Sequence, residues 1–306
     1  MYALKTKKLT KKYGNKIVVN EIDLTIEKGK IFGFLGKNGA GKSTFINMIT
    51  GIIQPTGGYY ELLGYKKAQQ KECWRRIGVL PDYSSLYENM TAIELMEYFS
   101  KILKLYLKKE DLLELLDKVE LKDAAKLKTK HFSFGMKKKL GIAQALINNP
   151  ELIFLDEPTS GVDANSALTI HSILKEIAAN GTTIFLTSHN LNEVEKLCDE
   201  VAIMNKGVLQ AKGSIEDLRK TYKKNLTVYI KHSAICKNQQ ESLLRDLKEN
   251  VEKCKINELN SHLVIEDEAR IPTINKLFLS KNIDIFRLEV DEPSLEEIFM
   301  NIDNPI

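Results

Sequence analysis

The stretch that decides the fold is Gly36-Lys37-Asn38-Gly39-Ala40-Gly41-Lys42-Ser43-Thr44. It follows an apolar, β-prone segment at 30–35 and leads into STFINMITG, where apolar residues recur at helical spacing. The pattern fits GxxxxGKS/T, and its place between a strand and a helix is the context that makes this motif credible. We therefore expect a strand, a phosphate-binding loop and a helix, with Gly51 as the C-terminal stop of the helix.

The residue types of this loop suit the binding of a nucleoside triphosphate. Glycines allow successive backbone N–H groups to converge on phosphate oxygens at the positive end of the helix dipole. Lys42 would reach the β- and γ-phosphates, and the Ser43 hydroxyl would ligate Mg²⁺. The alternative is a glycine-rich turn with a solvated lysine, which the flanking strand and helix disfavour.

A second pattern is the apolar run LIFL at 152–155, which ends in Asp156 and Glu157. At the carboxyl edge of a parallel sheet, Asp156 would lie beside the nucleotide loop and hold Mg²⁺, directly or through water. Glu157 would orient or deprotonate the attacking water. An acidic pair after a strand is as often a helix N-cap, and the phosphate loop makes the functional interpretation the preferred one.

The remaining pattern predicts an α/β chain with a mostly parallel core sheet. β-prone segments at 3–9 and 17–26 precede the loop, and residues 84–148 are predominantly helical and rich in Leu, Lys and Glu. A further strand at 182–186 alternates with helices at 165–179 and 191–197, as in a parallel sheet covered on both faces.

The pattern changes near residues 221–225, where we place a domain boundary. Residues 221–306 hold 12 basic and 15 acidic residues, against a net charge of +7 for residues 1–220. We expect a large domain at 1–220 and a small α/β unit at 221–306 with no evident catalytic cluster. The elements expected in the small unit are strands at 226–231, 263–266 and 284–290, helices at 241–250 and 272–281, and a last short helix with Ser294 near its start.

Composition excludes several classes of protein. The 306 residues are 43% hydrophobic and 28% charged, and the net charge of +4 is too mild to argue for a nucleic-acid or membrane-surface patch. No apolar run reaches the length of a membrane-spanning helix, and the N-terminus does not resemble a secretory signal. The four scattered cysteines indicate reduced thiols, most of which serve in packing.

Several motifs now stand in a recognisable order, and together they resemble the ATP-binding cassette (ABC) transporter ATPases over roughly residues 1–220. After the loop come Phe132-Ser133-Phe134-Gly135-Met136, the pair at 156–157, Ser160-Gly161-Val162-Asp163 and Thr187-Ser188-His189. The resemblance implies the P-loop NTPase fold of that family, with an N-terminal antiparallel β subdomain and a helical subdomain at about 84–148. It also implies Mg²⁺-dependent ATP hydrolysis, a separate transmembrane permease subunit, and head-to-tail pairing with a second ATPase subunit.

The resemblance also implies roles for single residues. Ser133, the Gly135 backbone and Met136 would cap the nucleotide held by the partner subunit. Asp163 would link the two sites, and His189 would contact the γ-phosphate and help to position water. Tyr13 would stack on adenine. Two bland alternatives remain open: Tyr13 as an ordinary strand-end aromatic residue, and His189 as part of a helix N-terminal cap.

The chain departs from the family pattern at three places. Phe134 replaces the first glycine of the usual LSGGQ signature, where a backbone with positive φ would be strained. Asp82 stands where glutamine is usual, so its contact with the Mg²⁺ shell is the least secure assignment. Lys139 stands where arginine is common. We interpret the lysine run at 137–139 as a solvated helix face rather than an anion patch.

The C-terminal sequence EPSLEEIF resembles the appendage of drug- and peptide-exporter ATPases, and the signature resembles the bacitracin-type and antimicrobial-peptide branch. We therefore expect an exporter ATPase for a peptide, antibiotic or drug-like substrate, at the cytoplasmic face of the membrane and without a nucleic-acid partner. A soluble ABC switch, as in DNA repair or translation, is disfavoured because long coiled coils and a second cassette are missing from the sequence. A P-loop GTPase is disfavoured because Asn205-Lys206-Gly207 offers no NKxD.

Overall fold

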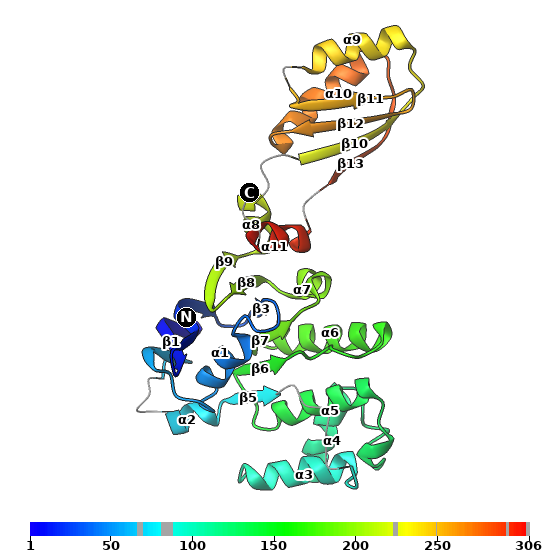
Figure 1. Ribbon diagram of the computed structural model, residues 1–306. Coiled ribbons are helices and arrows are strands. Elements are labelled where there is room, and N and C mark those ends of the chain that lie inside the picture. Colours follow the sequence, from blue (N-terminus) through cyan, green and yellow to red (C-terminus); the bar gives the residue numbers. More distant parts are fainter. Residues whose placement is uncertain (66–69, 81–87, 223–225, 249, 292–293, 304–306) are drawn as a thin grey trace. The chain divides into compact units, whose positions relative to one another are not determined.

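The computed structural model describes residues 1–65, 70–80, 88–222, 226–248, 250–291 and 294–303 (Figure 1). They form two compact units, Met1–Ile215 and Glu216–Ile306. Helix α8 (Ile215–Tyr222) therefore begins at the division, whereas the change of sequence pattern had suggested a boundary after it. The charge pattern does not reveal this helix because it is itself highly charged and Leu218 is its buried residue.

The core of the first unit is a six-stranded sheet whose five parallel strands are followed by one antiparallel edge strand. β3 and β7 are buried along their whole length, as expected for strands covered on both faces. The expected parallel core sheet is thereby confirmed. In sheet order, the strands are β5 (Ile77–Leu80), β6 (Leu152–Asp156), β7 (Thr183–Ser188), β3 (Ile31–Leu35), β8 (Glu200–Asn205) and β9 (Val208–Gly213).

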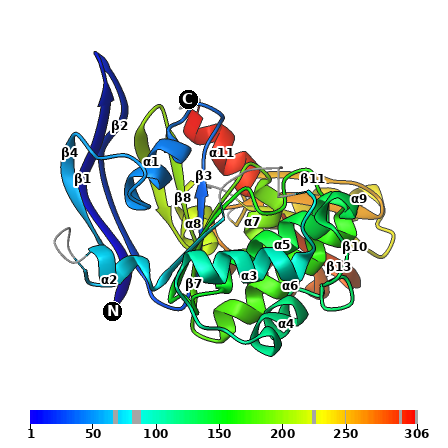
Figure 2. The same ribbon diagram turned by 90° about the horizontal axis from the view of Figure 1, so that it is seen from below.

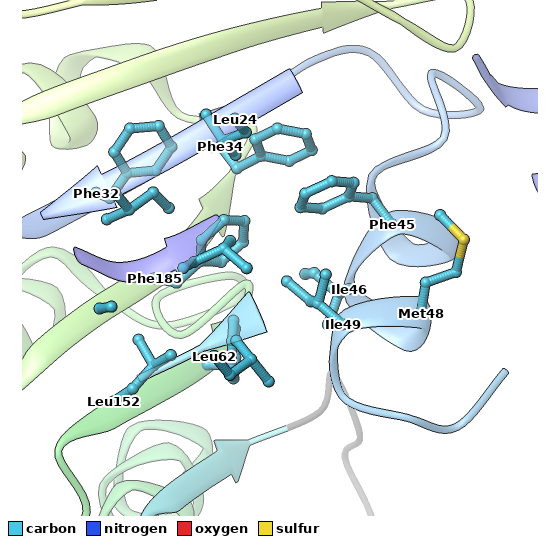
Figure 3. Close-up of a cluster of buried hydrophobic side chains, with 14 of the residues drawn as sticks. Leu24, Phe32, Phe34, Phe45, Ile46, Met48, Ile49, Leu62, Leu152 and Phe185 are labelled. Carbon is cyan, nitrogen blue, oxygen red and sulfur yellow. The ribbon is translucent and has the colours of Figure 1, made fainter. Parts of the chain in front are cut away.

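A second, antiparallel sheet forms the N-terminal β subdomain. Its order is β2 (Lys16–Glu27), β1 (Tyr2–Tyr13), β4 (Gly57–Leu62). Helix α1 (Lys42–Ile49) lies between this sheet and the core sheet (Figure 2). The rings of Phe34 and Phe45 stack with centroids 4.8 Å apart, and Phe185 packs beside them (Figure 3). This aromatic cluster fixes the helix that carries Lys42 against the strands that carry the other site residues.

The helical insert contains three helices and a short 3-10 turn: α3 (Ala92–Ile102), α4 (Lys109–Lys118), η2 (Thr129–His131) and α5 (Phe134–Leu146). Helix α5 packs closely on β5, because a Cβ on Gly78 would lie 2.1 Å from the Ala145 carbonyl oxygen. A short helix, α2 (Gln70–Trp74), precedes β5. The helical subdomain is thus joined to the core sheet through the helix that begins with the signature segment.

Two more helices cover the core sheet, α6 (Ala164–Ala179) and α7 (Leu191–Leu197). Each follows a parallel strand, so its N-terminus lies near the carboxyl edge of the sheet, where ligands bind in open α/β folds. Asp163 caps α6 and Asn190 caps α7 through side-chain hydrogen bonds to the helix backbone. Within the described residues, no helix is long and apolar enough to cross a membrane.

The second unit is a four-stranded antiparallel sheet, with α9 and α10 on the same face (Figure 1). Helix α9 begins earlier than expected because the Gln239 side chain accepts a hydrogen bond from the Cys236 N–H at 3.0 Å. Ser294 accepts from the Glu297 N–H at 3.2 Å, as expected for a residue that starts a helix. The elements are β10 (Leu226–His232), α9 (Lys237–Leu247), β11 (Lys253–Ile256), β12 (Asn260–Ile265), η3 (Glu268–Arg270), α10 (Ile271–Ser280), β13 (Ile285–Asp291) and α11 (Leu295–Asp303).

Candidate functional site

The loop between β3 and α1 has the form that the sequence predicts. The Lys42 ammonium donates to the carbonyl oxygens of Gly36 at 2.6 Å and Lys37 at 3.3 Å, so the lysine closes over its own loop. A side chain at Gly41 could not be accommodated: φ is 109° there, and a Cβ would lie 2.6 Å from the Val18 carbonyl oxygen. The loop is therefore a tight backbone cradle that requires glycine.

The start of α1 suits an anion. Its N-cap is Gly41, and no side chain makes a capping hydrogen bond to the first turn. The first N–H groups of a helix have no partner within the helix, and the helix dipole favours negative charge at that end. Ser43 and Thr44 belong to this turn, and Asn38, Gly39 and Ala40 belong to the loop before it. The residues present therefore fit a phosphate group.

The charge of Lys42 is balanced by two carboxylates. Burial lowers the pKa of the Lys42 ammonium, and the negative charges of Glu157 and Asp156 oppose that shift. Lys42 comes from the loop after β3, and the carboxylates come from the end of β6, which lies two strands away in the sheet. The fold thus brings Lys42 close to an acidic pair that is far from it in the sequence.

The acidic pair is held in place by Thr187. In the parallel register, Asp156 at the end of β6 lies opposite Thr187 of β7. The Thr187 hydroxyl donates to the Asp156 carboxylate and accepts from the Glu157 backbone N–H at 3.1 Å. The sequence motif gives Thr187 no role of its own. A buried β-branched residue at the end of an apolar strand is an ordinary feature, and the strand register is what reveals the contact.

Glu157 and His189 are also brought together. His189 Nδ1 lies 2.8 Å from Glu157 Oε2, and the His189 side chain is largely exposed. Asn190, not His189, provides the side-chain cap of α7. The acidic pair is not a helix cap either, because the next helix begins only at Ala164 with Asp163 as its N-cap. The capping alternative is therefore wrong for the acidic pair, whereas His189 does lie at the start of α7, one residue before its N-cap.

The signature segment starts α5. Ser133 is the N-cap, and its hydroxyl accepts from the Met136 N–H at 3.2 Å. Phe134 is the first residue of the helix and does not have a positive φ. The backbone strain expected from a phenylalanine in place of the usual glycine therefore does not arise. A Cβ on Gly135 would lie 2.7 Å from Ser166 Oγ, which makes glycine necessary for the close approach of α5 to the start of α6.

Asp163 and Tyr13 have local contacts that leave their implied roles open. The Asp163 carboxylate accepts from the Ser166 N–H at 3.0 Å and from the Ser166 hydroxyl at 2.6 Å, and these bonds lower its pKa. Tyr13 ends β1, is 49% exposed, and has the Lys11 ammonium 5.0 Å from its ring centroid. An exposed ring face of this kind can stack on a flat base or remain a solvated strand end.

One sequence interpretation is wrong. Lys138 lies in the lysine run that we had interpreted as a solvated face, yet the residue is only 4% exposed. Its ammonium donates to the Glu157 carbonyl oxygen at 2.7 Å. Lys139 is also largely covered and pairs with Glu120 at 3.3 Å. The pattern fails here because long basic side chains can cross an apolar surface to reach an acceptor. Asp82 lies outside the described residues.

Comparisons with known proteins agree with this geometry. Residues 19–160 match the ABC transporter family, and residues 213–302 match the C-terminal domain of DrrA1-3-like ATP-binding proteins. The chain is 37% identical to the bacitracin transport ATP-binding protein BcrA of Bacillus licheniformis, over 98% of this chain and 96% of that protein. It is 33% identical to the linearmycin resistance ATP-binding protein LnrL of Bacillus subtilis, over 98% and 97% of the two chains.

Solved structures give the same result for the first unit. An ATP-binding subunit of an ABC transporter aligns with a TM-score of 0.64 and 30% identity over 72% of this chain and 93% of that chain. An ATP-binding cassette in a dimeric post-hydrolysis state, bound to ADP and Pi, aligns with a TM-score of 0.62 and 26% identity over 69% and 98%. The chain therefore belongs to the ATP-binding subunits of ABC transporters, and it is an ATPase whose ATP hydrolysis powers transport.

Proposed function

We propose that this ATPase drives the export of a peptide antibiotic or a similar drug-like molecule through a separate transmembrane subunit, from the cytoplasmic face of the membrane. The observation that carries the catalytic part is the convergence of Lys42, Asp156, Glu157 and His189 at the carboxyl edge of the core sheet. The names of the bacitracin and linearmycin relatives, which align over nearly the whole chain, support the class of substrate.

In this proposal, different residues of the chain bind the phosphates, stabilise developing charge and activate water. The loop at 36–44 holds the phosphates through backbone N–H groups, and Lys42 supplies positive charge where negative charge develops. Glu157 takes the proton of the attacking water or orients that water. The N–H and the carbonyl oxygen of Glu157 are both hydrogen-bonded, which helps to keep its carboxylate in one position. His189 holds the Glu157 carboxylate through Nδ1 and would contact the nucleotide through Nε2.

Mg²⁺ fits the site through the hydroxyl of Ser43 and the carboxylate of Asp156, both oxygen donors of the kind that this ion prefers. The described residues contain no group of three or more His, Cys, Asp and Glu side chains that could hold a metal alone. A site formed by Ser43 and Asp156 suits an ion that takes its other ligands from a nucleotide and water. When bound, Mg²⁺ would neutralise charge on the phosphate oxygens.

We further propose that two ATPase subunits pair head to tail, so that Ser133, Gly135 and Met136 cap the nucleotide of the partner and Asp163 links the two sites. Ser133 is the N-cap of α5, and the dipole of this helix favours negative charge at the same end. The dimeric cassette that aligns with the first unit supports this arrangement. Tyr13 would stack on adenine in the subunit that holds the nucleotide.

Resistance in a bacitracin-sensitive bacterium tests the substrate and the partner together. The chain is expressed with a candidate transmembrane subunit, as wild type or as Lys42→Met, and the inhibitory concentrations of bacitracin and linearmycin are measured. We expect the wild type to raise one of them several-fold and the Lys42→Met variant to leave it unchanged. Equal resistance for both proteins at equal expression would contradict ATP-driven export of these molecules.

A further inference from the structure

Glu157 has a left-handed backbone conformation, and three of its groups form hydrogen bonds. Its φ of 53° lies in the left-handed region, which non-glycine residues adopt rarely and at some cost in energy. Its N–H donates to the hydroxyl of Thr187 at the end of β7, and its carboxylate bonds His189, which follows that strand. Its carbonyl oxygen accepts from Lys138 Nζ at 2.7 Å, and this third support comes from a different element, α5.

The hydrogen bond from Lys138 to Glu157 compensates for the burial of the Lys138 ammonium. A buried ammonium group loses hydration, which is costly unless the group finds hydrogen-bond acceptors. Charge-assisted hydrogen bonds are stronger than neutral ones, so the Glu157 carbonyl is a substantial part of that compensation. The ammonium also lies 5.7 Å from the centroid of the Phe134 ring, within the range of a cation–π contact.

Phe134 provides a second connection between the same two segments. A Cβ on Gly161 would lie 3.0 Å from the edge of the Phe134 ring, so the ring packs directly on the loop that follows Glu157. The first two turns of α5 are thus attached to the segment at 157–161 by one polar and one aromatic contact. The residue that departs from the usual signature is one of the two attachments.

We propose that Lys138 is a positioning residue for ATP hydrolysis, which fixes the Glu157 peptide from the signature helix and thereby sets the direction of the Glu157 carboxylate. The proposal rests on the role of Glu157 in the proposed function. The segment that would cap the partner's nucleotide begins α5 at Ser133, and Lys138 lies on the same helix. A displacement of α5 on dimerisation would therefore be transmitted to Glu157 of the same chain.

The test compares variants of the full chain by ATP turnover, nucleotide affinity and melting temperature. Lys138→Met removes the donor with little change in volume, and Lys138→Arg retains a buried cation that can reach the carbonyl. Lys139→Met is the matched control, because it removes the neighbouring lysine and its Glu120 pair without touching Glu157. The measurements use Mg-ATP for turnover and a fluorescent ATP analogue for affinity.

We expect Lys138→Met to lower kcat by about 10-fold to 100-fold with nucleotide affinity unchanged, because misplacement of a catalytic group by about 1 Å can cost about 100-fold. Lys138→Arg should recover most of the loss, and Lys139→Met should stay near wild type. If Lys138→Met does not fold, Lys138→Gln is judged by the same criterion. A kcat within twofold of wild type overturns the proposal, as does a loss of kcat that only parallels losses of affinity and melting temperature.

Glu157→Gln separates this proposal from the proposed function. If Glu157→Gln hydrolyses ATP at the wild-type rate, the role of Glu157 is wrong and the positioning proposal falls with it. If Glu157→Gln is inactive while Lys138→Met turns over normally, only the proposal for Lys138 is overturned.

Discussion

The core sheet of the first unit is mostly parallel, the sheet of the second unit is antiparallel, and the candidate site lies at an edge of the parallel one. In the first unit, β3, β6 and β7 are parallel and buried, so their carboxyl ends lie at one edge of the sheet. In the second unit, β10 is antiparallel to both of its neighbours and alternates between buried and exposed residues. Neighbouring antiparallel strands end at opposite edges, so polar residues at their ends do not converge.

The polar residues of the second unit illustrate the difference. His232 is buried, but its Nε2 lies 2.9 Å from Ser261 Oγ and its Nδ1 lies 2.9 Å from the Ser233 carbonyl oxygen. Its hydrogen bonds are satisfied within the core of the unit, as expected for a structural histidine. His189 of the first unit is exposed and directed at a carboxylate. The comparison shows that sheet topology, rather than residue type, distinguishes the two histidines.

The largest effect is expected from Lys42→Met. This change removes the positive charge at the phosphate loop and two hydrogen bonds that close the loop. Loss of one preorganised donor to a transition-state oxyanion typically costs about 100-fold to 1,000-fold, so kcat/KM should fall by at least about 100-fold. Steady-state release of phosphate from Mg-ATP measures the effect. Activity within threefold of wild type would show that the loop is not the nucleotide site.

A smaller effect distinguishes the two cores. Phe185 and Phe278 are both fully buried, one in each unit. Truncating either to alanine should cost about 3–5 kcal/mol in the unit that contains it. We expect Phe185→Ala to lower both the melting temperature and ATP turnover, because this ring supports α1.

For Phe278→Ala, we expect unfolding of the second unit at lower temperature with ATP turnover largely retained. Calorimetry and phosphate release on the same samples make the comparison. Equal loss of turnover in the two variants would show that the second unit is required for catalysis, and the separation of roles would be wrong.

The next effect depends on pH and on His171 of α6. Burial lowers the pKa of His171 from its ordinary value of 6.5, Glu193 opposes the shift, and Lys175 and Lys196 add to it. As the pH falls through 6.5, the unfolded chain takes up this proton before the folded one does. The stability that this group provides at neutral pH is therefore lost toward the lower, folded pKa.

Thermal unfolding between about pH 7.5 and about pH 5.5 measures this loss in wild type and in His171→Gln. The variant should have a lower dependence of melting temperature on pH over this window. Superimposable pH profiles would show that His171 does not contribute to the acid sensitivity of the first unit.

The smallest effect concerns thiol reactivity. Burial raises the pKa of Cys73 to about 11, and burial also raises the pKa of Cys198. Cys236 of the second unit is exposed. Thiolates are the reactive species, so iodoacetamide should modify Cys236 in the folded protein and the two first-unit cysteines only on unfolding. Mass spectrometry of the labelled peptides gives the order, and early labelling of Cys198 would contradict the described core.

Sequence reasoning predicts the first unit well where burial imposes a strong pattern. The helix α7 and the strand β3 fall within a residue of the expected ranges, since a cap marks where α7 begins and the loop motif marks where β3 ends. Five strands were not predicted: β4, β5, β8, β9 and β11. β4, β9 and β11 are largely half-exposed or exposed, so their apolar pattern is weak. β5 and β8 are short apolar runs, whose periodicity does not distinguish a buried strand from a buried helix segment. The charged helix α8 was not predicted for a related reason, since its single buried residue gives no periodic apolar pattern.

The candidate site divides in the same way. Lys42, Asp156, Glu157 and His189 could be proposed because each belongs to a motif whose residue types are tied to a chemical role. Thr187 and Lys138 could not, because their contacts depend on strand register and on the packing of α5. A run of three lysines looks the same in sequence whether its middle member is solvated or buried against another segment, as Lys138 of α5 is.

The central claim is that Glu157 performs the proton transfer or water orientation that hydrolysis requires. The most direct measurement is ATP binding and phosphate release by Glu157→Gln beside the wild type, with dimerisation in ATP followed by light scattering. We expect unchanged ATP binding, a nucleotide-trapped dimer, and turnover reduced by about 100-fold or more. Wild-type turnover in the Glu157→Gln variant would contradict it.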